Sequence, residues 1–177
     1  AGDTKMIEIS KAIKEGALAF LGAEYRLLLF FVIGSSIALF FVSTQVQTTH
    51  WMIVPSFIIG AIFSALAGNI GMRIATDANA RTAEAAKTSL PKALKVSFNG
   101  GTVMGLGVAG LAVLGLSLIF LFLLSQFYSM DSTFYIKMTL ILETLAGFSL
   151  GAESIALFAR VGGCLLYTSP SPRDLST

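Results

Sequence analysis

The sequence predicts an all-α membrane protein, a polytopic bundle of about four transmembrane helices. Hydrophobic residues make up 55% of the chain and charged residues only 12%, whereas soluble domains are nearer about a quarter charged. The mean hydropathy is +0.80. Four apolar stretches can each cross a bilayer core of about 30 Å as a helix. These observations exclude a soluble enzyme and indicate a multi-pass integral membrane protein whose first partner is the lipid bilayer.

The first helical element is amphipathic and precedes the first span. Residues 1–26 mix lysines and glutamates with apolar side chains at roughly helical spacing. We expect them to form a cytoplasmic lead-in helix. The first span then covers residues 27–43 and can extend back over residues 19–21 to reach the necessary length. The chain does not begin with methionine, so we expect it to start inside a longer protein.

The second span covers residues 52–72 and carries small residues four positions apart, at Gly60, Ser64 and Gly68. Small residues at this spacing let two helices approach closely in lipid, so we interpret them as packing residues. His50 and Trp51 stand just ahead of this span, where an aromatic belt at the membrane surface is expected.

The third span covers residues 101–124 and the fourth covers residues 138–160. The third contains a G-x-G-x-x-G pattern from Gly105 to Gly110. A dinucleotide-binding loop needs a preceding strand, whereas a spanning helix surrounds these glycines. We therefore interpret them as packing residues as well.

Lysine and arginine are concentrated in one connection between spans. Residues 73–95 contain five of them and residues 44–50 contain none. By the positive-inside rule, the N-terminal segment and residues 73–95 are cytoplasmic, and residues 44–50 and 125–137 lie outside. Pro91 marks a break and a new helix start within the cytoplasmic connection. Basic and acidic residues are interspersed, so no basic patch predicts a nucleic-acid partner.

Two charges interrupt the fourth span and form the candidate functional feature. Glu153 and Arg160 are seven residues apart and share a helix face with Ser149 and Ala156. Charged side chains are costly in lipid, so a stripe of this kind usually faces a protein interior or an aqueous path. The single cysteine and single histidine predict neither a disulfide nor a metal site built on these residues.

Four long segments resemble the membrane-bound, ion-pumping inorganic pyrophosphatases. They read EGALAFLGAEY, GNIGMRIATDANARTAEAA, FNGGTVMGLGVAGLAVLGLSLIF and GFSLGAESIALFARVGG, at residues 15–25, 68–86, 98–120 and 147–163. Their order and spacing are similar to that family over nearly all of residues 3–163. The GAES form of the fourth segment is similar to bacterial members, which implies a bacterial cell membrane.

The resemblance implies that the chain is a fragment of a larger pump and corresponds to its second through fifth spans. Members of this family are homodimeric enzymes that hydrolyse cytoplasmic pyrophosphate and move protons, sodium ions or both. Mg²⁺ bridges the pyrophosphate to a cluster of aspartates, and some members depend on K⁺. Arg160 matches the arginine of the family's Arg-Val-Gly-Gly motif, which implies a role in the ion gate. For Glu153 a role in the ion pathway and a structural role are both open.

The resemblance changes after Gly163. The family continues with a Lys-Ala-Ala-Asp segment, which holds its first substrate-binding lysine and metal-binding aspartates, whereas residues 164–177 read CLLYTSPSPRDLST. We expect this tail to be disordered or an artefact and set it apart from the fold. We therefore expect no catalytic, metal-binding or pyrophosphate-binding residue in this chain, and no activity from the chain alone. Two alternatives stay open: a piece of a secondary transporter or channel, and a small non-catalytic protein with four spans.

Overall fold

Four long α-helices make up the computed structural model. It describes residues 4–46, 49–128 and 133–168. Residue 128 and residues 162–168 are described by their backbone alone. The helices are α1 (Thr4–Gln45), α2 (Ile53–Ala86), α3 (Leu90–Tyr128) and α4 (Phe134–Thr168). No strand occurs among these residues, and all four helices are long and apolar enough to cross a membrane. The prediction of an all-α, four-span bundle is confirmed.

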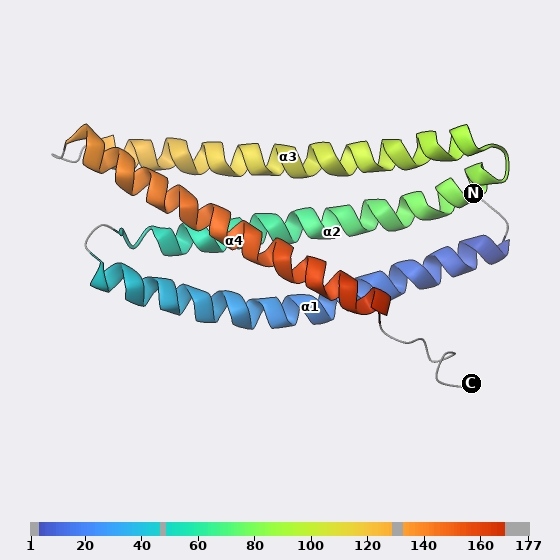
Figure 1. Cartoon of the computed structure of the whole chain (residues 1–177), viewed down its shortest axis with the longest axis horizontal. Coiled ribbons are helices and arrows are strands. Elements are labelled where there is room, and N and C mark those ends of the chain that lie inside the picture. Colours follow the sequence, from blue (N-terminus) through green and yellow to red (C-terminus); the bar gives the residue numbers. More distant parts are fainter. Residues whose placement is uncertain (1–3, 47–48, 129–132, 169–177) are drawn as a thin grey trace.

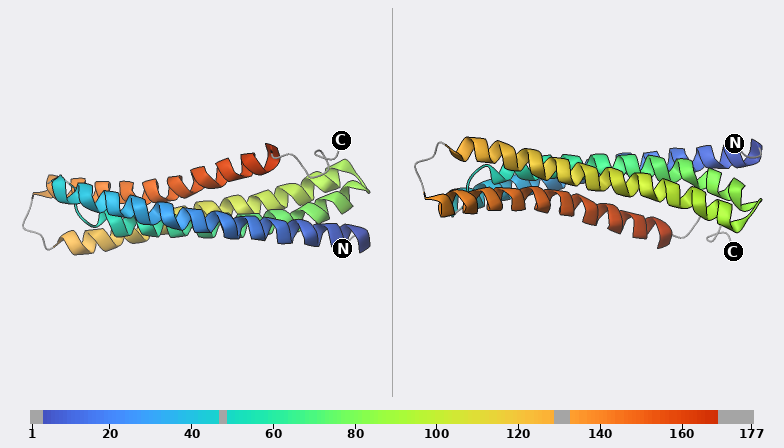
Figure 2. Two further views of the ribbon diagram at one scale, coloured as in Figure 1. Left: turned by 90° about the horizontal axis from the view of Figure 1, so that it is seen from below. Right: turned by 90° about the horizontal axis from the view of Figure 1, so that it is seen from above.

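The helices form a layer of three with the fourth laid across it. α1 and α3 both pack on α2 and, within the described residues, make no contact with each other. α4 crosses one face of this layer diagonally and packs mainly on α2 (Figure 1). Figure 2 shows α4 outside the layer of the other three helices. α2 is therefore the central helix of the bundle.

Each helix extends beyond its predicted span because little in the sequence separates the apolar stretch from its polar continuation. α1 runs without a break from the amphipathic segment into the span. α2 continues to Ala86, and α3 begins at Leu90. Pro91 lies in the first turn of α3, where its missing N–H group is not needed, as the sequence indicated.

α4 also extends further than its predicted span over residues 138–160. It continues to Thr168, five residues into the segment 164–177 that was expected to be a tail. Residues 169–177 lie outside the described residues, and the expectation that they are disordered or an artefact stays a prediction.

The closest helix packing occurs where α4 crosses α2, and glycines make it possible. Gly60 of α2 lies against the backbone of Phe148, and Gly151 of α4 lies against the backbone of Phe57. A Cβ atom at either glycine would meet a backbone carbonyl oxygen. The two helices approach this closely only because neither position has a side chain. The interpretation of Gly60 as a packing residue agrees with this contact.

Three other glycines that were interpreted as packing residues, all in α3, meet no other helix of the described chain. No atom lies within 4 Å of the position that a Cβ atom would take at Gly105, Gly107 or Gly110. At Gly68 the nearest such atom is the Tyr25 hydroxyl oxygen, at 3.9 Å. For packing within the described chain the interpretation is wrong for Gly105, Gly107 and Gly110, whereas the contact of Gly68 with α1 agrees with it. Spacing shows that small residues share a helix face, but it does not show whether another helix covers that face.

Two small apolar clusters hold the bundle together. Leu28, Ala61 and Ile155 join α1, α2 and α4. The second cluster consists of Leu123, Phe127 and Ile141, and it joins α3 to α4 at the end of the bundle where α3 ends and α4 begins. Many other apolar side chains face outward, and Phe30 and Leu106 are each 70% exposed. Apolar faces of this extent are rare on proteins surrounded by water, and a bilayer is the solvent that suits them.

Candidate functional site

The structure places the predicted charged stripe on the outward face of α4. Glu153 and Arg160 are both exposed, as are Ser149 and Ala156 between and beside them. Ile155 lies on the opposite face and is buried in the cluster with α1 and α2. The four stripe residues therefore share a face, as their spacing predicted, and within the described residues no other helix covers that face.

Neither charge of the stripe is neutralised by the described residues. The ion pairs there are Lys14–Asp77 and Lys87–Glu84, and neither includes Glu153 or Arg160. These two do not pair with each other, because seven residues of helix separate them by about 10 Å along the axis. The outward face of α4 therefore carries a carboxylate and a guanidinium that each require a polar partner.

Arg160 is the last residue of the predicted fourth span and lies near the beginning of the predicted first span in α1. Phe158, two residues earlier, packs on Phe31 of α1 with the ring centroids 4.7 Å apart. α4 then continues for about two further turns to Thr168. An arginine at this edge of the bilayer core can extend its guanidinium to the headgroups, whereas the carboxylate of Glu153, about two turns deeper, is costly in lipid without a partner. The stripe therefore needs another polar helix or an aqueous path beside it.

A second polar feature joins α1 to α2 beyond the apolar spans. Lys14 Nζ donates a hydrogen bond of 2.7 Å to Asp77 Oδ1, and both side chains are exposed. This hydrogen bond, with the nearby charges of Arg81 and Arg73, lowers the pKa of Asp77. Sequence reasoning missed the pair because its members are 63 positions apart and belong to no motif. Their position just outside two neighbouring spans was the only available signal.

Acidification is expected to loosen this end of the bundle. Because the pKa of Asp77 lies below its usual 3.8 in the folded chain, the ionised carboxylate favours the folded state. That stabilisation is present above about pH 4 and is lost as the pH falls through the lowered pKa. Spin labels at Ala12 and Ala83 should report longer and broader distances at pH 2 than at pH 6. Asp77→Asn should show the broad distribution at both values, and a wild-type distance that ignores pH would contradict this account.

The opposite end of the bundle is aromatic. The ring of His50 lies 5.3 Å from that of Phe127 and 5.6 Å from that of Trp51, between centroids. His50 Nδ1 accepts a hydrogen bond of 3.3 Å from the backbone N–H of Met52, and burial lowers the pKa of His50. This ring-packed histidine has the surroundings that an aromatic belt provides. Within the described residues, no three His, Cys, Asp or Glu side chains gather as they would around a metal ion.

Comparison with known proteins gives consistent matches along most of the chain. Residues 1–170 match a family model described as inorganic H⁺ pyrophosphatase, so the match continues beyond Gly163. A putative K⁺-stimulated pyrophosphate-energized sodium pump of Clostridium tetani is 47% identical over 164 residues. A K⁺-insensitive pyrophosphate-energized proton pump of Methanosarcina mazei is 42% identical over 164 residues.

A third relative, the K⁺-stimulated pyrophosphate-energized sodium pump of Thermotoga maritima, is 39% identical over 170 residues. Each of these alignments covers 92% of this chain but only 21% to 23% of the relative. The chain thus spans about a fifth of the length of the curated relatives it matches.

Proposed function

The chain belongs to the family of inorganic H⁺ pyrophosphatases, and from this we propose that it supplies four spans of a larger ion pump. The whole pump couples the hydrolysis of pyrophosphate to the movement of protons, sodium ions or both across the membrane. The sequence identity to the chain is similar for a relative named as a sodium pump and for one named as a proton pump. The proposal therefore does not specify which ion is transported. It also includes a homodimeric whole pump in a bacterial cell membrane, on the strength of the family resemblance.

The observation that carries the proposal is the outward stripe on α4. If four helices made up the whole protein, Glu153 would face lipid at a high cost in free energy, and Arg160 would lie at the edge of the bilayer core without a protein partner. In a larger pump the same face would pack on further helices or line a polar path. Fixed charges at such a place are typical of ion pathways in membrane proteins. We propose that Arg160 acts in the ion gate and that Glu153 lines the path beside it.

Mg²⁺ is the metal that we propose for the hydrolysis carried out by the whole pump. Among the residues that the structure describes, no three candidate ligands come together to hold it. Asp77 and Glu84 are moreover engaged with Lys14 and Lys87. We propose that the Mg²⁺ ligands lie in parts of the pump outside this chain, as the family resemblance implies. K⁺ is a further proposal, because the relatives include both K⁺-stimulated and K⁺-insensitive pumps.

The test compares the 177-residue chain with a longer protein that contains it. One assay measures the release of orthophosphate from pyrophosphate in the presence of Mg²⁺, and the other measures pyrophosphate-driven uptake of ²²Na⁺ or protons into sealed vesicles. We expect the longer protein to do both and the chain alone to stay at the rate of a protein-free blank. Hydrolysis by the chain alone would contradict the proposed division of labour.

The same measurements separate the alternatives. A longer protein that moves ions without pyrophosphate would favour the secondary transporter or channel. If the source genome encodes no longer protein around this chain, the small non-catalytic protein with four spans is favoured instead.

A further inference from the structure

An apolar groove runs between the N-terminal end of α1 and the C-terminal end of α2. Its volume is about 410 Å³. Met6, Ile9 and Ile13 line it from α1, and Ala80 and Ala83 line it from α2. The three α1 residues lie at i, i+3 and i+7, so they form a single row along the helix. Ile9 is 53% exposed and Ile13 is 46% exposed.

The groove lies beyond the predicted bilayer core. Its α2 residues begin at Thr76, which follows the predicted end of the second span at Met72 by about 6 Å of helix. Its α1 residues belong to the amphipathic segment ahead of the first span. Lipid tails therefore do not cover Ile9 and Ile13. A row of exposed apolar side chains outside the core is typical of a surface that binds another protein segment.

The groove continues the face on which α4 packs. Ile13 precedes Phe31 by 18 residues, or about five turns, so both lie on one face of α1. Phe31 packs on α4. In the same way Asn79 lines the groove and follows Ala61, which packs on α4, by 18 residues. Figures 1 and 2 show that α4 stops well short of the N-terminal end of α1. The face that α4 covers further along the bundle is therefore open at the groove.

Both charged residues that line the groove are lysines. Lys5 has no ion-pair partner among the described residues, and Lys87 pairs with Glu84 of its own helix. Both lysines lie at the end of the groove furthest from the predicted spans, since Lys5 is the first of its α1 residues and Lys87 the last of its α2 residues. An acidic side chain at that end of a partner would complement them.

We propose that this groove binds an amphipathic cytoplasmic segment of the larger pump, from a part outside this chain. The segment lays an apolar row against Ile9 and Ile13, as an amphipathic helix does in a hydrophobic groove, and places an acidic residue beside Lys5. Most of each relative lies outside the matched part, which covers 21% to 23% of its length. A second copy of the groove offers lysines and no acidic side chain, so it fits less well. The inference rests on the proposed function, because it requires a larger pump around the chain.

The test compares cysteine labelling in the longer protein and in the 177-residue chain, both in nanodiscs. Ile9→Cys and Ile13→Cys, each in a background without other cysteines, are treated with a water-soluble maleimide. Their rates should fall on the order of tenfold in the longer protein, because a packed interface core excludes water and reagent. Ile7→Cys is the matched control, since Ile7 is 49% exposed but lies outside this groove, and it should react equally in both. Equal rates for Ile9→Cys in the two proteins, or equal protection of Ile7→Cys, would overturn the proposal.

Charge reversal tests the acidic end of the partner. In the longer protein Lys5→Glu should raise the labelling rate of Ile9→Cys severalfold, because it places two like charges together. Lys11→Glu changes the charge of the same helix outside the groove and should leave that rate unchanged. An unchanged rate in Lys5→Glu would reject an acidic partner.

Photo-crosslinking identifies the occupant without relying on a labelling rate. In the longer protein, p-benzoylphenylalanine in place of Ile13 should crosslink to a peptide outside residues 1–177, as read by mass spectrometry. Crosslinks to lipid alone, or to residues 1–177 of a second subunit, would overturn the proposal. Neither experiment needs pyrophosphate. A protected groove in a longer protein that does not pump would reject the proposed function alone, and an open groove in an active pump would reject this inference alone.

Discussion

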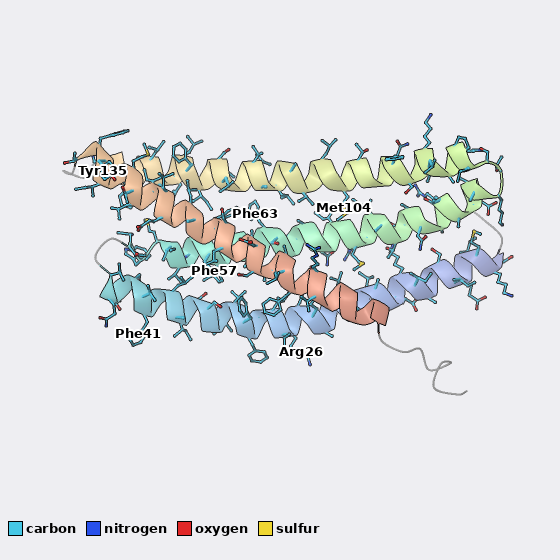
Figure 3. All side chains as sticks on the ribbon, viewed as in Figure 1. Arg26, Phe41, Phe57, Phe63, Met104 and Tyr135 are labelled. Carbon is cyan, nitrogen blue, oxygen red and sulfur yellow. The ribbon has the colours of Figure 1, made fainter. Side chains whose placement is uncertain are left out.

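Gly151→Ala is expected to destabilise the bundle by about 1–3 kcal/mol, and Gly151→Val by more. The added Cβ atom would meet the backbone of Phe57 and Ala61, and backbone atoms in a helix cannot move aside as a flexible side chain can. α4 would have to shift away from α2 and lose part of its apolar contacts. Phe57, labelled in Figure 3, lies where α4 crosses α2. The free energy of unfolding is measured by titrating detergent micelles with dodecyl sulfate and following the circular dichroism.

A matched control lies on α3. Gly105→Ala adds the same methyl group in open space, so it should leave stability unchanged or raise it by up to about 1 kcal/mol through helix propensity. Gly60→Ala should be as harmful as Gly151→Ala, and the two effects should not add, because both act on one crossing. Equal destabilisation by Gly105→Ala and Gly151→Ala would contradict the packing described here.

Arg160→Ala is expected to reduce pyrophosphate-driven ion uptake by the longer pump on the order of a hundredfold, as the loss of one member of a charge pair would. The proposed gate depends on a charge that finds its partner outside this chain, and removing one member of a buried pair leaves the other uncompensated. Arg160→Lys keeps the charge but loses the planar fork, so an intermediate rate is expected. Uptake and pyrophosphate hydrolysis are measured on the same vesicles, and both should fall because a pump couples them.

Arg26→Ala is the matched control for this experiment. Arg26 is an exposed arginine of α1 without an ion-pair partner among the described residues, and it projects from α1 away from the α4 crossing (Figure 3). Its loss should leave uptake near the wild-type rate. Wild-type uptake by Arg160→Ala would reject the gate. Glu153→Gln separates the two roles of that residue, since uptake is lost if the charge lines the path and kept if the residue is structural.

At the candidate site the sequence predicted the shared helix face but not its orientation in the bundle. Spacing alone predicted that Glu153 and Arg160 share a helix face, because a helix of about 3.6 residues per turn places i and i+7 together. It did not predict that this face would be the one turned away from α2. The Lys14–Asp77 pair was not predicted at all, because a contact between two helices depends on their register, and register leaves no periodic trace in a single sequence.

The sequence by itself determined the number, kind and approximate extent of the helices. In lipid every backbone polar group must be satisfied internally, so a long apolar stretch has few choices other than a helix. The tertiary structure alone decided which small residues form the crossing, Gly60 and Gly151 and not Gly105 or Gly110. All of these glycines lie in apolar helices and look alike in sequence. Only the approach of a second backbone distinguishes them, because close packing is a property of two surfaces and not of one.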